Sequence, residues 1–111
     1  MYSNNLIKGT LRLIILRLLS LDRPMYGYEL SQKVKELSDG KIALTEGALY
    51  PTLHKLEAEG LVTVSKENIG KRIRKYYTVT NSGKEYAEHH ATEFVEFVQT
   101  MLILLNPGLK K

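Results

Sequence analysis

Residues 8–21 carry apolar side chains around most of the circumference of the helix that their spacing predicts. The apolar residues of this segment are Leu11, Leu13, Ile14, Ile15, Leu16, Leu18 and Leu19. A helix that is apolar nearly all round is buried on more than one side. A chain of 111 residues forms one modest core, so it has little material to cover both sides of such a helix. The sequence therefore predicts that a second subunit covers the remaining side.

The same segment does not read as a membrane span or as a secretory signal. Arg12 and Arg17 interrupt the apolar run, which is shorter than the roughly 20 residues that a span needs. The sequence contains no cysteine, which excludes disulfides and thiolate metal sites. We therefore expect a cytoplasmic protein that has no membrane partner.

Two shorter helices are predicted next. Residues 26–38 have apolar side chains at helical spacing, with polar side chains opposite. The following helix is predicted to start after the N-cap Thr45 and to stop at Gly60. Pro51 lies inside this helix, where it removes one backbone hydrogen bond, and we expect a local distortion rather than a break.

A hairpin and a long helix complete the predicted order. Residues 61–67 and 75–80 alternate in the manner of strands, and the residues between them are expected to form a loop with a basic tip. Thr80 caps a last helix that extends over residues 81–105. The predicted fold is therefore mainly α with a small β-hairpin, arranged as a winged helix-turn-helix plus a long C-terminal dimerisation helix.

The last helix has the pattern of a helix that packs along a partner. Its apolar residues step at alternating spacings of four and three through Ala87, Ala91, Phe94, Val98, Met101 and Leu105, and Val95 and Leu102 widen the seam. We therefore divide the chain into a DNA-binding domain over residues 1–80 and a dimerisation helix and tail over residues 81–111. The predicted homodimer interface consists of Leu11, Ile15, Phe94, Val98, Met101, Leu102 and Leu105.

Charge is distributed unevenly along the chain. The formal net charge is +4, and residues 66–75 hold a concentrated group of lysines and arginines, whereas glutamates dominate residues 85–96. A local basic patch beside an acidic tail is typical of a surface that docks a polyanion. The charge pattern thus favours double-stranded DNA as the partner of the hairpin.

In a winged helix-turn-helix, the third helix enters the major groove and the wing reaches the flanking backbone or the minor groove. The predicted DNA contacts from the third helix are Thr45, Gly47, Tyr50, His54 and Lys55, and those from the wing are Lys66, Lys71, Arg72, Arg74 and Lys75. The outer face of the third helix has no arginine or glutamine for bidentate contacts to bases. Sequence specificity is therefore expected to depend partly on dimer spacing and on DNA shape.

Three motifs in this order resemble the PadR family of transcription regulators. They are MYGYEL at residues 25–30, EGALYPTL at residues 46–53 followed by LEAEGL at residues 56–61, and RKYYTVTNSG at residues 74–83. The resemblance covers roughly residues 6–85, and the single last helix is similar to the compact branch of the family. It implies a homodimeric winged-helix repressor that binds a palindromic operator and is released by small molecules or stress signals.

The resemblance also implies a possible ligand site. Some compact members of the family hold flat aromatic ligands between aromatic side chains at the dimer interface. In this sequence, which has no tryptophan, Phe94 and Phe97 of the last helix are the aromatic residues that could serve. A small-molecule effector that binds near these two side chains is therefore expected.

Several of these residues also have a purely structural interpretation. Tyr26, Tyr28, Tyr76 and Tyr77 could be packing residues, and His54 could be an exposed residue without a DNA contact. Glu85, His89 and Glu93 share one helical face beside His90, which is a spacing that could bind a metal but is more typical of a solvated polar face. We predict no metal site and no cofactor.

Protein docking and enzymatic catalysis are the two alternatives to DNA binding. A winged helix can also dock a protein, but the basic hairpin and the third helix favour DNA. The sequence has no pair of nucleophile and base and no phosphate-binding loop, so no enzymatic activity is predicted.

Overall fold

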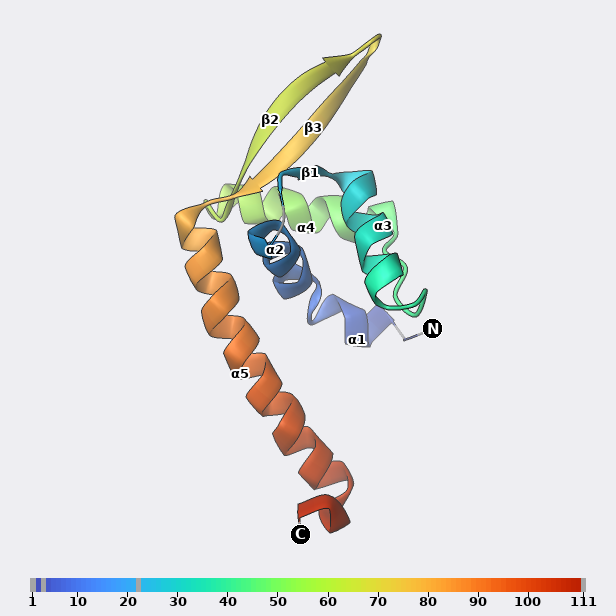
Figure 1. Cartoon of the computed structure of the whole chain (residues 1–111), viewed down its shortest axis with the longest axis vertical. Coiled ribbons are helices and arrows are strands. Elements are labelled where there is room, and N and C mark those ends of the chain that lie inside the picture. Colours follow the sequence, from blue (N-terminus) through green and yellow to red (C-terminus); the bar gives the residue numbers. More distant parts are fainter. Residues whose placement is uncertain (1, 3, 22, 111) are drawn as a thin grey trace.

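The computed structural model of the chain describes residues 2, 4–21 and 23–110. A body of short helices carries a hairpin that projects from one end, and a long C-terminal helix extends away from the body in the opposite direction (Figure 1). The elements are α1 (Asn4–Lys8), α2 (Leu11–Leu21), β1 (Met25–Tyr26), α3 (Gly27–Leu37), α4 (Glu46–Ala58), β2 (Val62–Ile69), β3 (Arg72–Val79), α5 (Asn81–Leu105) and the 3-10 helix η1 (Pro107–Lys110). This arrangement confirms the predicted fold class.

The sheet has one strand more than the predicted hairpin. The two-residue strand β1 pairs antiparallel with β3, so the strand order is β1-β3-β2. Its register places Met25 opposite Tyr77 and Tyr26 opposite Tyr76. A strand of two residues is too short to show alternation, which is why the sequence pattern gave no sign of it. β1 ties the start of α3 to the middle strand of the sheet.

The prediction of a basic loop between the strands was wrong. The strands continue to Ile69 and Arg72, which pair with each other across a two-residue turn formed by Gly70 and Lys71. Gly70 has a φ of 62°, which a tight hairpin turn requires and which glycine adopts without steric cost. Arg72 and Arg74 therefore lie on β3, where the pleat fixes the side on which each side chain emerges.

The predicted helix over residues 8–21 begins later, at Leu11 of α2, and the separate short helix α1 over Asn4–Lys8 precedes it. Thr10 lies between them, and its backbone NH and its hydroxyl both donate to the carbonyl of Ile7 at 3.0 Å. α2 buries Leu11 and Ile15 in the core of the single chain, so these two residues of the predicted dimer interface are not exposed to a partner, whereas Ile14 on the other side of the helix remains partly exposed. The apolar side chains of this segment are thus only partly buried by the rest of the described chain.

The core joins the helical body to the sheet. Its fully buried large side chains are Tyr77, Ile15, Leu16, Leu30, Leu53, Leu56 and Val62. They come from α2, α3, α4, β2 and β3, so burial of one apolar cluster fixes the positions of all these elements. Burial also raises the pKa of the Tyr77 hydroxyl, which keeps that side chain neutral in the core.

α5 begins, as predicted, immediately after its N-cap Thr80. The Thr80 hydroxyl accepts a hydrogen bond from the Gly83 NH at 3.0 Å and donates to the Gly60 carbonyl at 2.8 Å. A Cβ at Gly83 would overlap the Leu61 carbonyl and would lie 2.7 Å from Cγ2 of Val79. The close approach of the helix to the Leu61 backbone therefore requires glycine at this position.

Beside this junction, Arg12 links α2 to the C-terminal end of α4 by a salt bridge and to α5 by a hydrogen bond. The Arg12 guanidinium of α2 donates to both carboxylate oxygens of Glu59 at 2.6 and 2.8 Å and contacts the Tyr86 hydroxyl of α5 at 3.4 Å. The hydrogen bonds from Arg12 lower the pKa of Glu59, and the same bonds raise the pKa of Arg12. Because the folded-state pKa of Glu59 is depressed, this contact stabilises the fold above the ordinary glutamate pKa and is lost as the pH falls through the lowered value.

Beyond this junction, α5 extends away from the body (Figure 1). The buried residues of this 25-residue helix are Gly83 and Ala87, both near its start. Its later part exposes large apolar side chains, namely Val95, Phe97, Val98, Leu102, Ile103, Leu104 and Leu105. None of the described helices is both long enough and apolar enough to cross a membrane.

Candidate nucleic-acid interface

Helix α4 carries the candidate reading surface. As predicted, Thr45 caps the helix, because its side chain accepts a hydrogen bond from the Ala48 NH at 3.2 Å. The helix continues through Pro51, which has no NH to donate to the carbonyl of Gly47, an exposed residue of the first turn. Its buried face consists of Leu49, Leu53 and Leu56. The opposite face of α4 is exposed to solvent. The N-terminus of the helix, at one end of this face, favours the binding of anions.

A groove of about 680 Å³ separates this face from the wing. Its lining comes from the start of α3, from α4 and from the two wing strands, and consists of Tyr26, Gly27, Tyr28, Tyr50, His54, Ile69, Arg72, Ile73, Arg74, Lys75 and Tyr77. Among the described strands, β1 pairs with β3 only at Tyr76 and Tyr77, so the outer part of that strand edge faces open space. The groove is thus bounded by a helix on one side and by a strand edge with cationic side chains on the other.

The groove brings together part of the predicted set of DNA contacts. These are Tyr50, His54, Arg72, Arg74 and Lys75. The other predicted residues lie outside its lining. Thr45 and Gly47 lie beside a separate depression at the start of α4, and Lys55, Lys66 and Lys71 are exposed side chains that the groove lining does not include.

Two lysines face each other directly across the wing. The strand register pairs Lys66 with Lys75, on the same side of the sheet as Val64 and Tyr77. Like charges opposite each other in an antiparallel pair destabilise it. Among residues 2, 4–21 and 23–110, no ion pair compensates either lysine. A bound polyanion would remove this repulsion.

Arg74 lies on the other side of the wing and is held in place. Its guanidinium lies 4.0 Å from the centre of the Tyr26 ring, and a hydrogen bond with the Tyr76 side chain raises the pKa of Arg74. Glu29 accepts from Arg23 at 2.7 Å and from the Tyr26 NH at 3.2 Å, and these bonds lower the pKa of Glu29. The contacts with Tyr26 and Tyr76 therefore hold the Arg74 guanidinium at the rim of the groove.

The position of Tyr50 depends on the absence of a side chain at Gly27. A Cβ at residue 27 would lie 2.7 Å from Cζ and 2.9 Å from Cε1 of Tyr50, and it would overlap the hydroxyl. Gly27 is buried and is the first residue of α3. The ring of Tyr50 thus packs directly on the α3 backbone, beside the core contacts between the two helices.

Sequence reasoning did not include several groove residues in the site. Gly27, Ile69 and Ile73 were not predicted, and Tyr26, Tyr28 and Tyr77 were interpreted as packing residues. Tyr77 is indeed buried, and Tyr26 packs edge-on against Tyr76 at 5.6 Å between ring centres, but Tyr28 is 62% exposed at the rim. The motif at residues 25–30 was the signal that could have located this wall of the groove.

Comparisons with known proteins agree on one family. The family model described as "Transcriptional regulator PadR-like family" matches residues 15–89. Transcriptional regulator YqjI of Escherichia coli is 36% identical over 91 residues, which are 82% of this chain and 42% of that protein, so the chain spans less than half of this relative.

Solved structures match over most of the chain. A PadR family transcriptional regulator from Eggerthella lenta is 31% identical with a TM-score of 0.78, and the match covers 92% of this chain and 87% of that one. A transcriptional regulator from Clostridium thermocellum is 26% identical with a TM-score of 0.82, and the match covers 88% and 95% of the two chains.

The packing of Tyr50 on Gly27 predicts a coupling between these two residues. Gly27→Ala should lower the free energy of unfolding by about 1–3 kcal/mol, because the new methyl group overlaps the Tyr50 ring. In a Tyr50→Ala background, the same change should cost little. Chemical denaturation of the four variants measures this difference.

Gly47→Ala is the matched control, because this glycine also lies in the first turn of a helix and a Cβ there meets no atom within 4 Å. It should leave stability unchanged or raise it slightly. A cost for Gly27→Ala that is equally large with and without the Tyr50 ring would contradict the assigned contact.

Proposed function

The chain belongs to the transcriptional regulator PadR-like family, and from this membership we propose that it represses transcription as a homodimer bound to a palindromic operator. Members of this family are DNA-binding regulators and not enzymes. The observation that carries the proposal is the groove between α4 and the wing, because it joins Tyr50 and His54 of α4, cationic side chains and an open strand edge on one surface.

The groove supports a specific orientation on DNA. α4 enters the major groove by its N-terminal half, and the wing lies along the flanking backbone. Tyr50 and His54 then face the bases or the adjacent phosphates, whereas Lys66, Lys71 and Lys75 bind phosphates as point charges. In this division, residues 1–80 bind DNA and residues 81–111 dimerise, although the first turns of α5 also pack on the body.

Exposed apolar surface supports the proposal that a second copy of the chain binds this one. A groove of about 820 Å³ between α1, α2 and α5 is lined almost entirely by apolar side chains, including Ile14, Leu18, Phe94 and Val98. Contiguous apolar surface of this kind marks a site of association in a water-exposed protein. A second copy would supply a matching α5, because a two-fold interface uses the same surface on both subunits.

The dimer proposal predicts that one charge on the exposed seam separates the subunits. Val98→Asp and Leu102→Asp should each weaken dimerisation by at least about a hundredfold, because a carboxylate would be buried without a partner. Both side chains are partly or fully exposed in the single chain, so the monomer should keep its helical circular dichroism. Sedimentation equilibrium measures the association. Gln99→Asp adds the same charge to a polar position of α5 and should leave it unchanged.

The wing proposal predicts a change in salt dependence. A dimer that contacts roughly eight phosphates should bind with a log–log salt slope of about −7. Lys66→Ala with Lys75→Ala removes four contacts per dimer and should move the slope towards about −3.5, with weaker binding to operator and to unrelated DNA alike. Lys84→Ala removes an exposed lysine of α5 outside the groove lining as a control. An unchanged salt slope in the double variant would show that these wing lysines do not contact DNA.

We further propose that a flat apolar or cationic compound releases the repressor. Phe94 lines the apolar groove, and the rings of Phe94 and Phe97 lie 6.3 Å apart between centres. A ligand held there could change the angle between subunits and hence the separation of the two α4 helices, which operator half-sites one turn apart fix at about 34–36 Å. The ligand acts only if it prefers the DNA-free form, and a tenfold preference corresponds to about 1.4 kcal/mol per site.

This proposal predicts that a planar aromatic cation binds the DNA-free dimer and lowers its operator affinity. Phe94→Ala and Phe97→Ala should each weaken the binding about tenfold, as measured by titration calorimetry, while Thr100→Ala should not. Binding that is insensitive to both phenylalanine substitutions, or that leaves operator affinity unchanged, would refute the release mechanism.

A further inference from the structure

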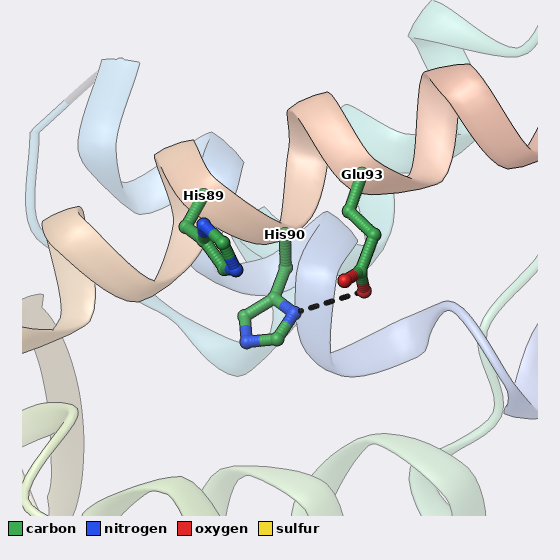
Figure 2. Close-up of side chains that lie close together, drawn as sticks. All are labelled: His89, His90 and Glu93. Atoms are coloured by element: carbon green, nitrogen blue, oxygen red, sulfur yellow. Dashed lines mark ion pairs between the residues drawn. The ribbon is translucent and has the colours of Figure 1, made fainter.

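A cluster of metal-ligating side chains lies on α5 outside the DNA-binding groove. Each of His89, His90 and Glu93 offers one ligand atom, and these atoms lie within 4.8 Å of one another. Figure 2 shows that all three side chains extend from the same side of the helix and that Glu93 lies beyond the two imidazoles. The spacing explains this, because Glu93 is four residues after His89 and three after His90, and both spacings bring side chains together on a helix.

The geometry is close to that of a bound ion. Two ligands of a tetrahedral ion with bonds of about 2.0–2.1 Å lie about 3.3 Å apart. His90 Nδ1 and the Glu93 carboxylate already lie 3.5 Å apart. His89 and Glu93 are exposed, so a change of side-chain rotamer can bring the third ligand closer without moving the helix backbone.

The surroundings favour a cation at this position. The surface beside the cluster is lined by Glu85, Glu88, His89, Thr92, Glu93 and Glu96. Carboxylates concentrated on one face create a negative potential that attracts metal ions. His90 is also held in place, because its ring lies 4.1 Å from that of Tyr86, measured between centres. One ligand is therefore positioned in advance, which reduces the entropy lost on binding.

We propose, against the expectation from the sequence, that His89, His90 and Glu93 bind one divalent transition-metal ion of the Zn²⁺, Co²⁺ or Ni²⁺ type. Two imidazoles and one carboxylate suit these ions better than Mg²⁺ or Ca²⁺, which prefer oxygen ligands. With three ligands from the protein, a fourth position is left for water or for a group from another molecule. The sequence had pointed to Glu85 with His89 and Glu93, whereas the structure places His90 in the set.

Titration calorimetry of the full chain with Zn²⁺ tests the site. We expect one ion per chain, and Glu93→Gln and His90→Gln should each raise the Kd at least tenfold. Co²⁺ should give the visible absorption of a four-coordinate complex, and both variants should lose it. Glu96→Gln is the matched control, because it removes the same charge from the same helix without removing a ligand, and it should change the Kd less than twofold.

Several results would overturn the proposal. They are an absence of saturable Zn²⁺ binding, equal Kd values for the Glu93→Gln and Glu96→Gln proteins, and displacement of Zn²⁺ by an equimolar amount of Mg²⁺. A loss of binding in Glu85→Gln together with unchanged binding in His90→Gln would also overturn it, because that result would assign the ion to the other set of residues.

Discussion

The apolar core fixes α4, and on the groove side the Tyr50 ring of this helix contacts the bare backbone of Gly27. Glycine lets the ring pack directly on the first turn of α3, and β1 ties that turn to the middle of the sheet. The width of the groove between α4 and the wing is therefore set by packing and by backbone pairing. If this surface binds DNA, as we propose, contacts formed in advance reduce the entropic cost of binding.

Charge complements this rigid frame in two ways. Lys66 and Lys75 face each other without a compensating acid among the described residues, so the free wing retains a repulsion that phosphates can relieve. Arg74, in contrast, is stacked on Tyr26 and fixed at the rim. At the other end of the molecule, the glutamates of α5 give the opposite potential. The charge distribution of the chain thus separates the proposed DNA surface from an acidic surface on α5.

Local signals allowed much of the fold to be predicted from the sequence. The caps Thr45 and Thr80 were predicted because a hydroxyl at a helix start acts on its own first turn. β1 and the contact at Gly27 depend on residues distant in sequence, so no local pattern predicts them. The wing was predicted too short, because a turn of only two residues was taken for a longer basic loop. The motif resemblance covered the residues of the groove wall, but their physical roles became visible only in three dimensions.

Lysine acetylation with and without operator DNA tests directly whether the groove between α4 and the wing is the DNA surface. Mass spectrometry reports the reactivity of each lysine in the folded protein. We expect DNA to protect Lys55, Lys66, Lys71 and Lys75, while Lys35 of α3 and Lys84 of α5 react as before. Unchanged reactivity of the wing lysines in a DNA complex, or protection centred on Lys35 and Lys84, would contradict this assignment.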